Sequence, residues 1–183
     1  MINYFGAGAN RDQNRLAMVL GHEAMGGRGV LLKDFSFGYQ LLNEIPEPAK
    51  EILQEAWGDD FRCYSVKKQV KASVVGRLWT LSEEDVEKMK EWEFVGTWKD
   101  WIEIKVCLDN GEVFKAYTEI IKDKYPLHGM ADGLYYRDQI NDRMPIRIKE
   151  DLAARDAELG KIRQQLMAMQ QYRLQLRRGL AFN

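Results

Sequence analysis

Two kinds of hydrophobic pattern divide this chain of 183 residues. Apolar runs or alternation with a period of two, both typical of strands, occur at residues 1–5, 30–39, 74–81, 101–108 and 113–121. Helices are expected at residues 11–20, 46–57 and 82–90, because the residues that flank them are common helix ends: Asn10 and Gly21, Pro48 and Gly58, and Ser82. Strands predominate through the middle of the chain with helices inserted between them. The pattern therefore predicts an α+β fold built on an antiparallel sheet or a barrel.

One stretch combines a buried strand with a strongly capped helix. Residues 74–81 hold β-branched and aromatic side chains around Gly76. Ser82 is a suitable N-cap, three acids follow it in the first turn, and Val86 and Met89 give the helix an apolar face. Glu93 follows between Trp92 and Phe94, where aromatic neighbours would shield its carboxylate from water. Because desolvation raises a carboxyl pKa toward neutrality, Glu93 is a candidate general base; the alternative is an ordinary surface acid.

A glycine-rich turn follows the first strand. Residues 6–10 read Gly-Ala-Gly-Ala-Asn, and small residues allow the backbone to approach a ligand with its amides exposed. The turn lacks the third glycine of a dinucleotide site and the lysine of a nucleotide-phosphate loop, so a tight turn without a ligand is an equal interpretation. Residues 26–29 are predicted to be flexible, residues 59–71 to be an irregular surface segment, and Asn110-Gly111 to form a hairpin turn.

The segment from residue 148 onward is different in character. Apolar residues recur there at spacings of three and four, which predicts one long helix that packs on its own domain, on a second copy or on a partner, in the manner of a coiled coil. The positions are Leu152, Leu159, Ile162, Leu166, Met169 and Leu176. We therefore expect one domain over residues 1–145 and a helical extension over residues 146–183.

Composition excludes several function classes. Hydrophobic residues make up 45% of the chain and charged residues 30%, which is typical of a globular protein, and the net charge of −1 gives no electrostatic case for nucleic acid or an acidic membrane. Cys63 and Cys107 are expected to be reduced, buried thiols. The sequence has no metal or cofactor signature, no membrane span and no signal-like N-terminus, so we expect no cofactor and a cytoplasmic location.

Several short motifs together resemble the gamma-glutamylcyclotransferase-like, or AIG2-like, family. Residues 4–10 resemble its N-terminal Y-G-S-N loop, and residues 75–81 its G-x-x-(W/Y) strand. Residues 89–93 stand where the family has L-D-x-x-E followed by glycine, residues 102–117 resemble its next strand pair, and residues 133–142 its G-L-x-x-x-Y segment. The resemblance covers residues 2–143 in co-linear order and implies a mixed β-barrel with flanking helices.

The resemblance also implies an activity. Family members cleave a gamma-glutamyl amide or amine: the substrate's α-amine attacks its own γ-carbonyl and releases 5-oxoproline. Glu93 matches the glutamate that acts as base and then as acid, and Tyr117 matches a pocket tyrosine. The substrate loop corresponds to Ala7, Gly8, Ala9 and Asn10.

This chain departs from the family pattern at several positions. Ala7 and Ala9 replace a tyrosine and a serine, Phe94 replaces the glycine after the glutamate, and Lys90 replaces an aspartate. The family's next tyrosine falls near Trp98 or Lys99. We therefore predict either a cyclotransferase-like enzyme in which Glu93→Gln removes activity without unfolding, or an inactive relative that binds a small molecule or protein; cleavage of a different acyl-amine bond is a third possibility.

Overall fold

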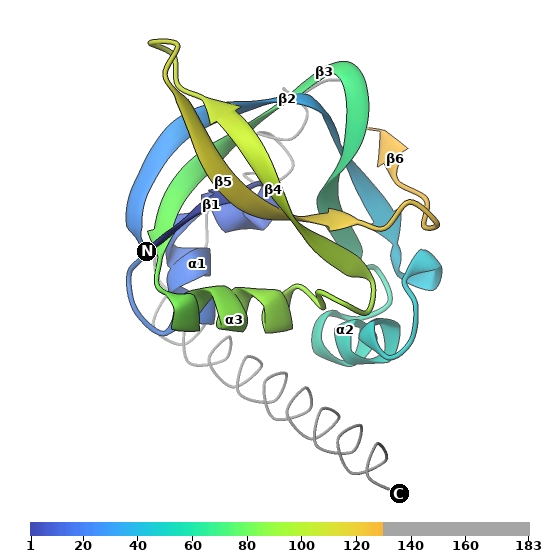
Figure 1. Ribbon diagram of the computed structural model, residues 1–183. Coiled ribbons are helices and arrows are strands. Elements are labelled where there is room, and N and C mark those ends of the chain that lie inside the picture. Colours follow the sequence, from blue (N-terminus) through green and yellow to red (C-terminus); the bar gives the residue numbers. More distant parts are fainter. Residues whose placement is uncertain (130–183) are drawn as a thin grey trace, which may run out of the picture.

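The computed structural model describes residues 1–129, which form a closed mixed β-barrel of five strands (Figure 1). The strands are β1 (Ile2–Gly6), β2 (Met25–Leu41), β3 (Arg62–Leu81), β4 (Lys99–Cys107) and β5 (Val113–Ile121). Around the barrel the order is β1, β3, β2, β4 and β5, and a parallel pairing of Tyr4 with Tyr117 joins β5 back to β1. A short strand, β6 (His128–Gly129), pairs with β2. The predicted α+β barrel is therefore confirmed.

Three α-helices within residues 1–129 lie along the lower side of the barrel in Figure 1. They are α1 (Gln13–Leu20), α2 (Ala49–Trp57) and α3 (Glu83–Trp92), and two 3-10 turns, η1 (Gly8–Arg11) and η2 (Leu42–Glu44), accompany them. The cap predicted for α3 is present, since the Ser82 hydroxyl accepts a hydrogen bond from the Asp85 amide at 3.1 Å. Val86 and Met89 are buried as expected. Within residues 1–129 no helix has the length and hydropathy needed to cross a membrane.

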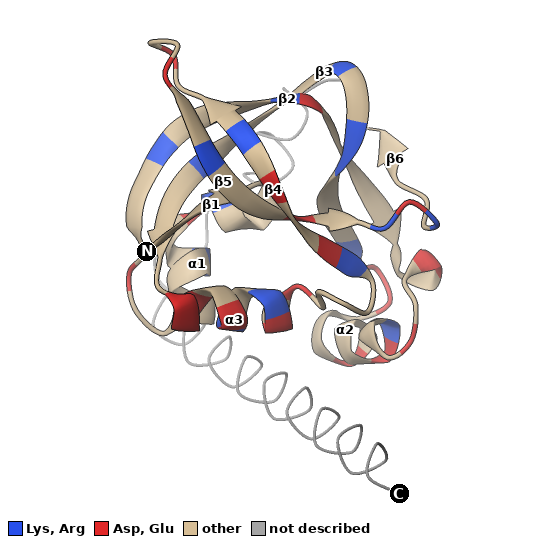
Figure 2. Ribbon diagram, in the orientation of Figure 1, with Lys and Arg blue, Asp and Glu red and all other residues tan. Residues whose placement is uncertain are grey.

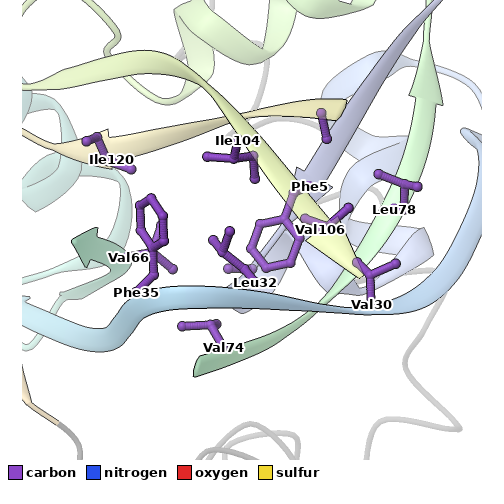
Figure 3. Close-up of a cluster of buried hydrophobic side chains, with 12 residues drawn as sticks. Phe5, Val30, Leu32, Phe35, Val66, Val74, Leu78, Ile104, Val106 and Ile120 are labelled. Carbon is purple, nitrogen blue, oxygen red and sulfur yellow. The ribbon is translucent and has the colours of Figure 1, made fainter. Parts of the chain in front are cut away.

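Side chains on opposite faces of β1 enter two different hydrophobic clusters. Phe5 points into the barrel, where it meets residues of every other strand, among them Leu32, Val106 and Leu78 (Figure 3). Tyr4 lies in the second cluster, between the outer face of the barrel and helices α1 and α3. Burying side chains of this size contributes roughly 1.5–3 kcal/mol each to stability. The alternation along β1 thus fixes both the barrel interior and the helical layer that carries the candidate site.

Two segments predicted to be irregular are in fact strand. Residues 26–29 belong to β2, and their glycines allow close packing: a Cβ at Gly27 would lie 2.7 Å from the Trp79 ring. Residues 62–71 belong to β3, whose polar side chains at residues 67–71 are largely exposed on a strand paired with β2. Sequence patterning missed both because the first segment is three glycines and an arginine, and the second is mostly polar without a regular alternation of apolar residues.

Two smaller expectations also need correction. Helix α1 begins at Gln13, and Asp12, not Asn10, is its N-cap, since the Asp12 carboxylate accepts from the Arg15 amide at 2.9 Å. Cys63 and Cys107 are both free thiols, but only Cys63 is buried. The long helix and the oligomer contacts predicted beyond residue 145, and the segment 133–142, lie outside the described residues.

Gly76 provides a test of the barrel packing. A Cβ at this position would lie 2.2 Å from Phe5 Cε2 and 2.8 Å from the Gly6 carbonyl oxygen. We expect Gly76→Ala to lower the free energy of unfolding by roughly 1–3 kcal/mol, because Phe5 cannot move without disturbing the core. Gly29→Ala on β2 is the matched control, since a Cβ there meets no atom within 4 Å. Equal stability of the two variants in urea denaturation would contradict this account.

Candidate active site

Glu93 is placed by the end of helix α3. Its amide donates to the Met89 carbonyl at 2.9 Å, and Glu93 is the C-cap of the helix. The chain then reverses toward β4 through Phe94, whose φ of 55° lies in the left-handed region where glycine is favoured. Phe94 therefore makes the turn that the family's glycine would make. The Trp92 and Phe94 side chains enter different hydrophobic clusters, and the Glu93 side chain is only 13% exposed.

Both oxygens of the Glu93 carboxylate have polar partners. The Asn10 side-chain amide donates to Glu93 Oε1 at 2.8 Å. Lys99, on β4 and 2% exposed, forms an ion pair with Glu93 Oε2. Groups from η1 and β4 thus fix the orientation of one carboxylate at the end of α3.

Two hydrogen bonds of its backbone hold Asn10 in place. Its carbonyl accepts a hydrogen bond from the Trp79 indole nitrogen at 2.9 Å, and its amide donates to the Ala7 carbonyl at 3.0 Å. Gly8, with a φ of 58°, makes the turn between them. The Asn10 amide, which we expected to face a substrate, is therefore used inside the turn, and the side chain reaches the site instead.

A second carboxyl group lies beside the first. The Asn10 side-chain amide also donates to Glu119 Oε1, at 3.2 Å, and to the Tyr4 hydroxyl, at 2.8 Å. The Tyr4 hydroxyl in turn donates to Glu119 Oε2 at 3.0 Å. Burial and the neighbouring Glu93 charge raise the pKa of Glu119 to about 8. Burial and the two glutamates raise the pKa of Tyr4 well above its usual value.

Lys99 carries the positive charge of this network. Burial lowers the pKa of Lys99, because it disfavours the charged form. The negative charges of ionised Cys63, Glu93 and Glu119 have a larger effect in the opposite direction, so the pKa of Lys99 is raised. Burial raises the pKa of the Cys63 thiol to about 11, so Cys63 is neutral at pH 7. With Cys63 neutral, the Glu93 carboxylate, which pairs directly with Lys99, is the main group that holds Lys99 as an ammonium ion at that pH. We call Tyr4, Asn10, Glu93, Lys99 and Glu119 the buried polar network.

Comparison with solved structures reveals the fold type. A gamma-glutamyl cyclotransferase structure superposes with a TM-score of 0.57 at 16% sequence identity, covering 69% of each chain. An uncharacterized protein from Homo sapiens gives a TM-score of 0.57 at 18% identity, over 84% of this chain and 86% of that one. A protein from Arabidopsis thaliana gives 0.58 at 17% identity, over 82% and 81%. The protein has the gamma-glutamyl cyclotransferase fold.

That fold is evident from the structure and not from sequence searches. No family model matches the sequence, and no curated protein matches it. Identities of 13–18% leave the activity open, because unrelated functions are found on shared folds. The fold nevertheless brings three of the motifs together: the η1 turn with Asn10, strand β3 with Trp79, and the end of α3 with Glu93.

Within this gamma-glutamyl cyclotransferase fold, the predicted site residues do not all meet. Glu93 and the Asn10 side chain are in direct contact, and Ala7 and Gly8 form the turn that presents Asn10. Ala9 is exposed. Tyr117 lies outside the buried polar network: its hydroxyl is 3.4 Å from Glu103 Oε2 and its ring stacks on Trp101, which stacks on Tyr4.

Three members of the network were not among the predicted site residues. Tyr4 was part of the first motif, and Lys99 stands near the family's tyrosine, but neither had a predicted role. Glu119 offered a usable signal, because it is a charged residue among the apolar residues that end β5. A carboxylate at an apolar strand end requires a partner, and that partner becomes visible only in the folded chain.

An open hollow of about 670 Å³ lies elsewhere on the molecule, beside α2 and the start of β3. Its lining includes Leu41, Leu42, Lys50, Gln54, Phe61 and Arg62. No member of the buried polar network lines it. The hollow is therefore separate from Glu93 and its neighbours.

Proposed function

We propose that the protein is a gamma-glutamylcyclotransferase-like enzyme that releases 5-oxoproline from a gamma-glutamyl amide or amine. The observation that carries this proposal is the Glu93 carboxylate, shielded from solvent and oriented through both oxygens by Asn10 and Lys99. A general base must be fixed within hydrogen-bond reach of the proton that it removes, and this arrangement meets the requirement of fixation. The shared fold and the co-linear motifs support the same reaction.

The proposed reaction needs one proton carrier. Glu93 accepts a proton from the α-amine as its nitrogen forms a bond to the γ-carbonyl carbon. The same proton then passes to the leaving nitrogen as the original C–N bond breaks, which gives 5-oxoproline and a free amine. Because nucleophile and carbonyl belong to one molecule, the enzyme mainly has to fold the substrate into a reactive conformation.

Substrate contacts are proposed on two sides of Glu93. Residues 7–9 would direct backbone amides toward the developing oxyanion, since the Asn10 amide is already used. Tyr117 and Trp101, both partly buried, extend the aromatic stack from Tyr4 outward, and would contact an apolar or aromatic part of the substrate. A substrate of this class fits the cytoplasm, which we propose as the location.

A second candidate function is binding without catalysis. Two observations favour it: Ala7 and Ala9 carry no hydroxyls, and one oxygen of the Glu93 carboxylate is already occupied by the ion pair with Lys99. In this alternative the site holds a small molecule, and the segment beyond residue 145 docks on a second copy or a partner. Deleting residues 148–183 and measuring the oligomeric state tests that docking role.

The test of the proposed function is 5-oxoproline release from a panel of gamma-glutamyl dipeptides and gamma-glutamylamines, measured by mass spectrometry. We expect release with the parent protein and none above background with Glu93→Gln. Release that is equal in the two proteins would exclude Glu93 as the catalytic group. If no panel member is cleaved by folded parent protein, ligand-induced NMR shifts with the same panel test the binding alternative.

A further inference from the structure

Glu119 is a buried carboxyl group that the proposed reaction does not use. It lies on β5, is 6% exposed, and faces the helical layer outside the barrel, as Tyr4 does. A carboxyl group in such a place costs free energy unless its environment compensates it. Its location beside Glu93 therefore calls for a role in the site.

Polar or titratable groups from five elements act on Glu119. β1 supplies Tyr4, which donates to Glu119 Oε2, and η1 supplies Asn10, which donates to Oε1. The end of α3, β4 and β3 supply the groups that act on Glu119 by charge: Glu93, Lys99 and, when ionised, Cys63. Two acids and one permanent cation thus share one buried site.

The side-chain nitrogen of Asn10 has fewer hydrogens than nearby acceptors. The Asn10 side-chain nitrogen carries two hydrogens, yet it lies within 3.2 Å of three acceptors, on Tyr4, Glu93 and Glu119. The charges of both glutamates likewise act on the ammonium group of Lys99. A change of charge on Glu119 must therefore redistribute Asn10 and Lys99 between the two carboxyl groups.

We propose that Glu119 is a positioning residue for Glu93: while protonated it leaves Asn10 and Lys99 to Glu93, and when ionised it draws them away and slows the reaction. The inference rests on the proposed function for its effect on rate. Pairs of carboxyl groups whose surroundings separate their protonation states recur where one acts as a base and the other stays neutral. Here only one of the two glutamates can be ionised without leaving a net negative charge in a buried site.

The direction of the pKa agrees with this division. Burial, and then the charge of Glu93, favour the protonated form of Glu119, with a pKa of about 8. Glu119 therefore stays neutral through pH 7 and ionises as the pH rises through that value. Loss of activity is expected on the alkaline side, because that is where Glu119 begins to compete for Asn10 and Lys99.

Carboxyl-carbon NMR tests the coupling without any substrate. In the parent protein the Glu119 carboxyl should titrate near pH 8. In Glu93→Gln its midpoint should fall by on the order of one pH unit or more, because the neighbouring negative charge is gone. A midpoint in the ordinary range of glutamate, or the same midpoint in both proteins, would overturn the inference.

The pH profile of kcat/KM for 5-oxoproline release tests the effect on the reaction. The parent should lose activity above about pH 8 relative to Glu119→Gln, in which position 119 cannot ionise. Titration of the substrate amine affects both proteins equally and cancels in the ratio. Glu112→Gln, at an exposed turn before β5, should retain the parent profile.

An identical alkaline limb in parent and Glu119→Gln would overturn the positioning role. If Glu119→Gln does not fold, the NMR comparison of the parent with Glu93→Gln decides the inference. If no gamma-glutamyl compound is cleaved, the proposed function fails by itself, and the same NMR comparison still decides whether the two glutamates compete for Asn10 and Lys99.

Discussion

Replacing Glu93 with glutamine should lower the rate of 5-oxoproline release by roughly 10²–10⁴-fold, the usual contribution of a general acid-base group. Glutamine keeps the shape of the side chain and can still accept from Asn10, but its amide cannot remove a proton at neutral pH. We expect kcat to fall and KM to change little, because the proton is transferred only as the reaction proceeds. The measurement is single-turnover and steady-state release of 5-oxoproline.

The matched control is Glu87→Gln on the same helix. Glu87 has a side chain that is 71% exposed and forms a surface ion pair with Lys90. The same chemical change there should leave the rate within about twofold of the parent, since surface ion pairs contribute little. Comparable losses in the two variants would point to general damage of α3 and would remove the case for Glu93.

The ion pair with Lys99 changes one expectation about Glu93→Gln. From the sequence we expected a loss of activity without any effect on folding. The structure indicates a stability cost as well, because the substitution removes the partner of a buried ammonium group. The rate of Glu93→Gln must therefore be measured at a temperature where circular dichroism shows the variant to be folded.

Replacing Lys99 with methionine should lower the free energy of unfolding by about 3–5 kcal/mol, as is typical when one partner of a buried ion pair is removed. Methionine fills most of the space of the lysine stem, so lost packing contributes little. The cost comes from a Glu93 carboxylate left without its cation in a shielded site. Urea denaturation at pH 7 provides the measurement.

Lys115→Met is the control for this second prediction. Lys115 also pairs with a glutamate, Glu103, but the two side chains are 62% and 50% exposed, so the loss should be much smaller than for Lys99→Met. A cost of Lys99→Met at pH 7 that is as small as the cost of Lys115→Met would contradict the ion-pair account.

Combining Glu93→Gln with Lys99→Met separates stability from catalysis. Removing both charges leaves neither partner uncompensated, so the double variant should recover stability relative to either single variant. It should not recover 5-oxoproline release, because the base is still absent. Recovery of release in the double variant would exclude Glu93 as the proton carrier.

Local signals in the sequence determined much of the fold. The Ser82 cap and the buried pair Val86 and Met89 specify α3, and the Asn110-Gly111 turn specifies the β4–β5 hairpin, because these features act over a few residues. The same locality explains why Glu93 could be singled out: it follows a recognisable helix end between two aromatic residues. Residues 26–29 and 62–71 were misjudged, because their strand conformation depends on pairing between β2 and β3 and not on their own pattern.

Only the tertiary structure decided what surrounds Glu93. The Asn10 side chain and the Glu119 carboxyl come from η1 and β5, which the closed barrel brings to the site of Glu93. Lys99 follows Glu93 by only six residues, but it reaches the carboxylate because the chain reverses between α3 and β4. The sequence by itself determined which residues could form a helix, a strand or a carboxylate-bearing turn. Which of the buried charges pair, and which of them stays protonated, depends on a shared low-dielectric environment that exists only once the barrel and helices have packed.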